Sequence, residues 1–104
     1  MAQHVAIKKI DERGNLMEDC NINFAEVINV LYKQQHFQEE YPWLSTIDPY
    51  GNTIINRIQV PFVVKELRKL QEKIQNSEFS SKIKNLTNFL NTVGIHEYAK
   101  FIGD

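Results

Sequence analysis

The first forty residues alternate between short apolar runs and polar turns, and they predict a hairpin followed by a helix. Residues 4–10 predict a strand that offers Val5 and Ile7 to one side, and residues 16–21 predict its return after a turn at 11–15. A helix should follow from Asn23 to about residue 35, because apolar residues then recur at helical spacing. Asn23 can cap this helix while Glu26 reaches back to it, as in a capping box.

Residues 43–61 predict a second hairpin, around which the remaining elements are organised. Two apolar, β-branched runs, 43–47 and 53–60, flank a polar turn. Within the turn, Asp48, Pro49 and Gly51 occupy positions i, i+1 and i+3 of a type I turn. The second run leads into a helix that Pro61 can open at its first position.

The third quarter of the chain predicts two amphipathic helices. From residue 60 to 75, apolar residues recur at spacings of three and four, while charged residues occupy the other faces. Residues 76–78 interrupt this pattern, and a further helix is expected from Ser80 or Ser81 to about residue 93. Gly94 is suited to end it in a left-handed conformation.

The last ten residues, 95–104, alternate as a strand does, although a short helix fits almost as well. With the strand, the order of elements is ββαββααβ. This order predicts an α+β fold: an antiparallel or mixed sheet of about five strands, with three helices on one face. Residues 1–104 are expected to form a single domain, since 104 residues with 42% hydrophobic content suffice for one core.

Composition narrows the classes of function. The net charge is −1, which gives no whole-chain attraction to nucleic acid or to an anionic membrane. Residues 1–52 are acidic and residues 53–104 are basic, which is typical of solvated helix faces. The single cysteine, Cys20, excludes an internal disulfide, and no signal peptide or membrane-spanning apolar run is visible. A cytoplasmic location is therefore expected.

Polar residues concentrate in and after the predicted central turn. If the carboxyl-terminal end pairs beside the hairpin, Asp104 can approach Arg57, and a bidentate ion pair would fasten the two segments. Alternatively, Arg57 binds an anion while Asp48 or His96 moves a proton. Six residues are expected to have structural roles in this region: Asp48, Pro49, Gly51, Asn56, Gln59 and Asp104.

Aromatic residues approach the same turn. Tyr41, Trp43, Tyr50 and Arg57 are residue types that favour binding interfaces. Tyr41 and Tyr50 are expected at the surface, whereas Trp43 also suits the core. The three histidines lie far apart in the sequence, so no metal or cofactor is expected. Cys20 is expected to be an inert thiol, because Glu18 and Asp19 should raise its pKa.

Two segments carry a resemblance to a known group of proteins. They are the run Ile47-Asp48-Pro49-Tyr50-Gly51-Asn52-Thr53, with Asn56-Arg57-Ile58-Gln59 after it, and the ending Phe101-Ile102-Gly103-Asp104. They resemble small uncharacterised bacterial proteins with a mid-chain Asp-Pro-Tyr-Gly-Asp/Asn-Thr segment and a Phe-Ile-Gly-Asp end. Such orphan proteins are typical of integron gene cassettes. The resemblance implies a cytoplasmic bacterial domain in which both segments belong together, and it implies no activity.

The sequence thus favours a small binding or protein-interaction domain without catalysis of its own. Its expected partners are a second copy in a homodimer, another protein or a small anion. The alternative is a small enzyme of the hydrolase or isomerase type that uses Asp48, Arg57 and His96. A third interpretation is an accessory protein that neutralises a partner through its acidic amino-terminal half.

Overall fold

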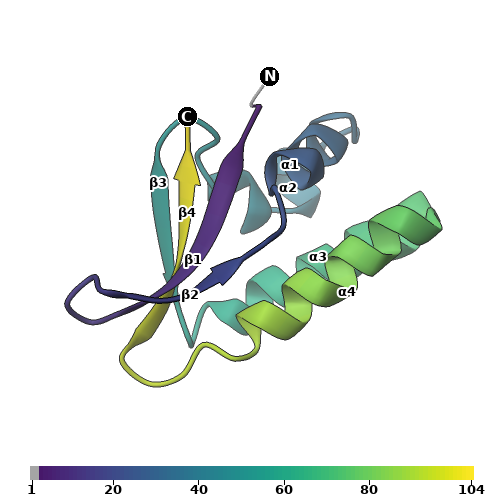
Figure 1. The fold of residues 1–104 in the computed structure, drawn as a ribbon. Helices are drawn as coiled ribbons and strands as arrows, with labels where there is room; N and C mark the ends of the chain where they lie inside the picture. The colour runs from purple at the N-terminus through teal and green to yellow at the C-terminus, as the bar shows by residue number, and fades with distance from the viewer. Residues whose placement is uncertain (1–2) are drawn as a thin grey trace.

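A four-stranded antiparallel sheet with helices on one side makes up the computed structural model, which describes residues 3–104 (Figure 1). The strands are β1 (Val5–Asp11), β2 (Leu16–Cys20), β3 (Asn52–Asn56) and β4 (Glu97–Gly103). The helices are α1 (Ala25–Tyr32), α2 (Phe37–Glu40), α3 (Val60–Ile74) and α4 (Ser77–Leu90), with a 3-10 turn η1 (Leu44–Thr46). The fold class α+β is as predicted.

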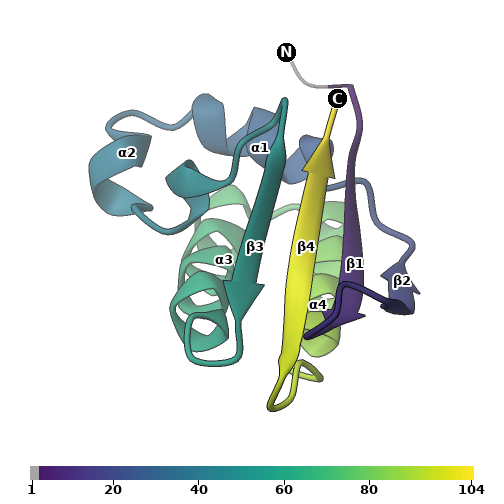
Figure 2. The same cartoon turned by 90° about the vertical axis from the view of Figure 1, so that its left-hand side faces the viewer.

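The last strand lies inside the sheet. The strand order is β2-β1-β4-β3, so β4 pairs with β1 on one side and with β3 on the other (Figure 2). The strand predicted within residues 95–104 is therefore confirmed, and the helical alternative is wrong. The predicted hairpin of β1 and β2 is confirmed as well.

The core lies between the sheet and the helices. Val5 and Ile7 of β1 and Phe101 of β4 are fully buried on the covered face of the sheet. The helices contribute the apolar stripes predicted from their spacing, and the ring of Phe24, just before α1, packs edge-on against Phe101 with centroids 4.9 Å apart. This packing fixes the position of β4 beneath α1.

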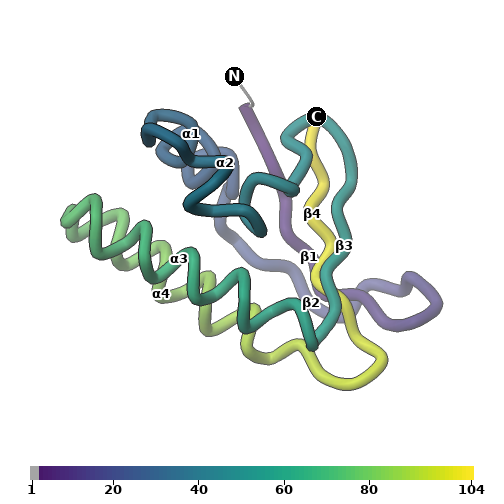
Figure 3. Tube along the Cα trace, turned by 180° about the vertical axis from the view of Figure 1, so that it is seen from behind, coloured from purple at the N-terminus to yellow at the C-terminus, as the bar shows by residue number. Residues whose placement is uncertain are grey.

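The predicted central hairpin is wrong, because residues 43–47 form no strand. Residues 44–46 are the turn η1, and the chain runs through it from α2 to β3 (Figure 3). The Thr46 hydroxyl donates to the Trp43 carbonyl at 2.7 Å, and such local bonds favour a helical turn over a strand. The sheet consequently has four strands, and β3 pairs with β4 instead. The additional short helix α2 lies where a connection was expected.

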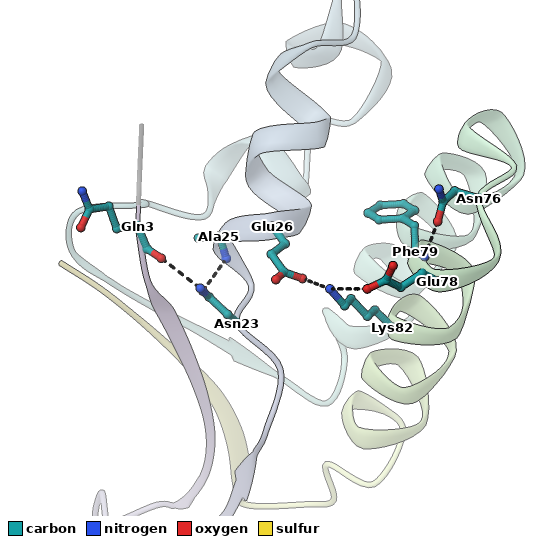
Figure 4. A network of polar contacts seen from close by, with 8 residues as sticks. All are labelled: Gln3, Asn23, Ala25, Glu26, Asn76, Glu78, Phe79 and Lys82. Atoms are coloured by element: carbon teal, nitrogen blue, oxygen red, sulfur yellow. Dashed lines mark hydrogen bonds and ion pairs between the residues drawn. The ribbon is translucent and has the colours of Figure 1, made fainter.

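The boundaries of α4 also differ from the prediction. Asn76 caps this helix by accepting the N–H of Phe79 at 2.9 Å, so α4 begins before Ser80 (Figure 4). The left-handed residue between α3 and α4 is Gln75, with a φ of 50°. Gly94 is not left-handed; that conformation falls on His96 instead, with a φ of 62°.

Asn23 fastens the start of α1 to β1. Its Oδ1 accepts the N–H groups of Val5 at 2.9 Å and Ala25 at 3.0 Å, and its amide donates to the Gln3 carbonyl (Figure 4). Glu26 does not complete the predicted capping box. Its carboxylate instead pairs with Lys82 of α4, which also lies 3.9 Å from Glu78. This ion pair therefore links α1 to α4 instead of capping the start of α1.

Residues 3–104 contain no helix that is both long and apolar enough to cross a membrane.

Gly103 of β4 packs closely against the backbone of the turn that precedes β3. A Cβ at this position would lie 2.3 Å from the Pro49 carbonyl oxygen and 2.8 Å from the Tyr50 nitrogen. We expect Gly103→Ala to lower the free energy of unfolding by roughly 1–3 kcal/mol, because backbone atoms must move to admit the methyl group. Urea denaturation measures this loss. The control is Gly94→Ala, whose Cβ would meet only the Glu97 side chain, at 3.3 Å. Equal stability of both variants would contradict the prediction.

Candidate functional site

The mid-chain turn and the carboxyl-terminal strand meet, as predicted, but through backbone contacts. Gly103 donates its N–H to the Gly51 carbonyl at 2.7 Å. Within the turn, the Asp48 carboxylate accepts the N–H of Tyr50 at 2.8 Å, and the Thr53 hydroxyl accepts the N–H of Asp48 at 2.9 Å. The φ angle of Gly51 is not left-handed. Its missing side chain matters because a Cβ would lie 2.5 Å from the Asp48 carboxylate.

The predicted ion pair between Arg57 and Asp104 is wrong. Antiparallel pairing places Asn52 opposite Ile102 and Asn56 opposite Tyr98. Arg57 therefore follows β3 beside the start of β4, whereas Asp104 follows the other end of β4. Arg57 forms no ion pair with any residue in the described range 3–104.

Asn56 and Gln59 have the structural role expected of them. The Asn56 N–H donates to the Gln59 side chain at 2.8 Å, and the Gln59 N–H donates to the Asn56 side chain at 2.9 Å. This reciprocal pair has the spacing of a capping box, but it closes the turn between β3 and α3 rather than capping α3 itself. It fixes the direction in which the chain leaves β3 and therefore the position of Arg57 between them.

Arg57 lines a hollow of about 190 Å³ where the β3–α3 and α4–β4 connections meet. Two of its lining residues are strongly exposed isoleucines: Ile58 at 72% and Ile95 at 65%. Bonds between Gly94 and Glu97 brace the second connection, since the Glu97 carboxylate accepts the Gly94 N–H at 2.8 Å. A neighbouring hollow shares Ile95 and His96 and adds the half-exposed Met17. We call Met17, Arg57, Ile58, Ile95 and His96 the loop-end surface.

The structure brings Arg57 and His96 together but leaves Asp48 elsewhere. Arg57 and His96 both line the hollow of about 190 Å³. The Nδ1 of His96 also lies 3.5 Å from a carboxylate oxygen of Glu12. Asp48 precedes β3 and Arg57 follows it, and the five residues of β3 alone separate them by roughly 13 Å. The three residues of the enzyme alternative therefore do not form one site.

The four predicted binding residues are dispersed too. Tyr41 is fully buried, contrary to its predicted exposure, and Lys69 Nζ lies 4.8 Å from its ring centroid. Burial raises the pKa of the Tyr41 hydroxyl, and the charges of Glu40 and Glu66 raise it further. Trp43 is half-buried and stacks on Phe62 with centroids 5.1 Å apart. Tyr50, as predicted, is exposed, at the end of β3 opposite Arg57.

Glu66 is an important residue that the sequence reasoning missed. Its carboxylate is buried and accepts the N–H of Trp43 at 3.0 and 3.1 Å and the N–H of Leu44 at 2.9 Å. It thereby binds the free N–H groups at the start of η1. A charged residue on the polar side of a helical pattern normally faces solvent, so the spacing of α3 gave no signal for this role.

A larger groove of about 500 Å³ runs along α3 and reaches Asn91 after α4. Its lining is mainly charged and includes Lys65, Arg68, Lys69 and Glu72, with Val64 and Pro61 as its apolar part. Residues 3–104 also contain no group of three His, Cys, Asp or Glu side chains placed to hold a metal ion.

With this geometry in place, comparison with models of known protein families, with curated proteins and with solved structures finds no match to the chain. The class of the protein is therefore defined by its fold and its surfaces: a four-stranded antiparallel α+β domain with a hollow lined by an exposed arginine and two exposed isoleucines.

Loss of the Glu66 carboxylate should destabilise the region around Trp43. We expect Glu66→Ala to lower the free energy of unfolding by about 2 kcal/mol, because the buried N–H of Leu44 and the partly buried N–H of Trp43 lose a charged acceptor. Thermal unfolding followed by tryptophan fluorescence measures this. Glu72→Ala on the exposed side of α3 is the matched control and should be near neutral. A Glu66→Ala protein as stable as the control would refute the role of Glu66.

The thiol of Cys20 should react slowly in the folded protein. Burial raises its pKa, and the charge of Glu18 adds to this, so the reactive thiolate is scarce at pH 7. We expect a thiol reagent to label Cys20 more slowly in the native protein than in the denatured chain at the same pH. A faster reaction in the native state would show an activated cysteine instead.

Proposed function

We propose that this protein is a small interaction domain without catalysis of its own, which binds a protein partner at its loop-end surface. The observation that carries the proposal is the exposure of Ile58 and Ile95, which come from two different connections and line the same hollow as Arg57. Exposed apolar side chains gathered around an arginine are typical of protein-binding surfaces, where arginine is a frequent hot-spot residue.

The backbone of His96 shapes the same hollow. Its left-handed conformation costs free energy in a residue other than glycine, and His36 and Gln75 adopt it elsewhere in the chain. Here it turns the chain between Ile95 and the start of β4, within the wall of the hollow. Replacement of this turn by a relaxed one would alter how Ile95 is presented beside Arg57.

The alternative is a small enzyme that acts on an anionic substrate bound by Arg57. Its support is that Arg57 and His96 share one hollow. The proton-transfer partner first expected there, Asp48, lies at the other end of β3, and its carboxylate is engaged by the Tyr50 N–H. The Glu97 carboxylate in the hollow already accepts the Gly94 N–H. The interaction domain therefore accounts for more of the site.

The cellular setting is part of the proposal. A lone cysteine fits a reducing compartment, so we place the protein in the cytoplasm. Its resemblance to integron-cassette proteins supports a bacterial origin.

A cross-linking residue placed at position 58 tests the proposal. A photoreactive amino acid there should attach the protein covalently to its partner in extracts of its native host. The identified partner is then purified, and its affinity is measured by calorimetry. We expect the double variant Ile58→Ser/Ile95→Ser to bind at least about tenfold more weakly, because it removes apolar contact from both sides of Arg57.

The control for this experiment is Tyr50→Ser. Tyr50 is 61% exposed, similar to Ile95, but lies at the opposite end of β3. It should leave the affinity unchanged, and both variants should unfold at the wild-type temperature. Equal affinities of wild type and the double variant would overturn the proposed surface.

A further inference from the structure

The free edge of β3 exposes a small, defined set of backbone hydrogen-bonding groups. β3 is the outermost strand beside β4, and Gly51 directs its carbonyl toward Gly103. Because antiparallel strands alternate the direction of these groups, Thr53 and Ile55 also face β4. The N–H and C=O groups of Asn52, Ile54 and Asn56 therefore point away from the sheet.

Asn56 is already engaged at this edge. Its N–H donates to the Gln59 side chain at 2.8 Å, and its carbonyl accepts the Gln59 N–H at 3.1 Å. The groups left at the edge of β3 are thus those of Asn52 and Ile54, and both residues are exposed.

We propose that β3 pairs with β3 of a second copy of this chain, antiparallel and with the two-fold axis at Thr53. In this register Asn52 of one copy lies opposite Ile54 of the other. Each pair then exchanges two backbone hydrogen bonds, so every free group at the edge is satisfied. Two four-stranded sheets become one continuous sheet. A two-fold contact of this kind closes on itself at a dimer.

Neighbouring registers fit less well. An axis at Ile54 would place Asn52 opposite Asn56, whose N–H and C=O already bond to Gln59. With the axis at Ile55, Ile54 of one copy would face Asn56 of the other, whose backbone groups are already bonded, and Asn52 would have no partner strand beside it. The register at Thr53 is the one that matches free donors with free acceptors in both copies, so the edge of β3 is complementary to itself.

The charges on the two edges of the sheet support β3 as the paired edge. The other edge strand, β2, carries Glu18 and Asp19, which would oppose like charges in a second copy, and its pairing with β1 is irregular between Lys9 and Ile10. β3 reads Asn-Thr-Ile-Ile-Asn and carries no charge. Natural proteins protect free edges with charges, proline or bulges, and β3 contains neither a charged residue nor proline.

Apolar side chains flank the proposed contact. Ile54 is 52% exposed on the open face of the sheet, and Phe62 of α3, stacked on Trp43, is 50% exposed. Figure 2 shows α3 on the side of the molecule where β3 has its free edge. Pairing of two copies would bring both helical layers together beneath the joined strands. This contact is separate from the loop-end surface, so either can exist without the other.

Two measurements over a range of protein concentrations test the proposed dimer: the mass in solution and the hydrogen exchange of backbone amides in β3. By analytical ultracentrifugation we expect the mass to rise from 12.2 kDa toward twice that value as the concentration increases. Hydrogen exchange at the Asn52 and Ile54 amides should slow over the same range. Exchange at Thr53 and Ile55 should be slow at every concentration, because β4 already protects those amides.

Ile54→Lys is the decisive variant, with Leu16→Lys as its control. Both residues are similarly exposed on an edge strand, at 52% and 56%, but on opposite edges. Ile54→Lys should keep the protein monomeric, whereas Leu16→Lys should dimerise as the wild type does. Ile54→Pro removes only an N–H that faces outward and should also be monomeric. Circular dichroism checks that each variant is folded.

Three results would overturn the proposal. The first is a mass of 12.2 kDa at every concentration reached. The second is a dimer that survives Ile54→Lys or Ile54→Pro. The third is a dimer in which the amides of Asn52 and Ile54 exchange as fast as in the monomer. None of these results bears on the loop-end surface, and Ile58→Ser/Ile95→Ser should leave the dimer intact.

Discussion

The structure depends on the insertion of the last strand between the first and the third. β4 supplies backbone partners to β1 and β3 at once, and Phe101 at its middle is fully buried against Phe24. β1 and β3 have no pairing with each other, so the four strands form one sheet only through β4. Pairing between strands that are far apart in the sequence costs loop-closure entropy. The hydrogen bonds within α3 and α4 join residues close in sequence and carry no such cost.

This dependence explains how much of the fold could be read from the sequence. Local periodicity was enough for α1, α3 and α4, because one apolar stripe identifies an amphipathic helix. It also indicated a strand from residue 53, where β3 lies, but it assigned that strand to residues 43–47 as its hairpin partner, whereas β3 pairs with β4. Residues 43–47 look like a strand because they are partly apolar, yet a carboxylate on α3 binds the N–H groups of Trp43 and Leu44 and favours a helical turn. That long-range acceptor leaves no local signal.

The same reasoning applies to the candidate site. The turn at Asp48, Pro49 and Gly51 was foreseen as structural, because the spacing of these residue types is itself the signature of a turn. Asn56 and Gln59 were expected to be structural within a strand, whereas they bond to each other in the turn that follows β3. Of the neighbours expected for Arg57, His96 lines the same hollow, but Asp104 does not approach it, because its place depends on the register between β3 and β4. Antiparallel pairing sends Asp104 to one end of the sheet and Arg57 to the other. The antiparallel direction of β4 relative to β3 therefore decides which polar residues lie close to Arg57.

Most polar side chains around β3 already form hydrogen bonds within the fold. Asp48 holds the turn before the strand, and Asn56 and Gln59 hold the exit after it. What remains for contact with other molecules is an arginine without an ion-pair partner in residues 3–104, the isoleucines beside it and the backbone between the two fixed ends. Under the proposed function, these are the groups that a partner would contact, because the fold holds the chain on both sides of them in place while their side chains stay exposed.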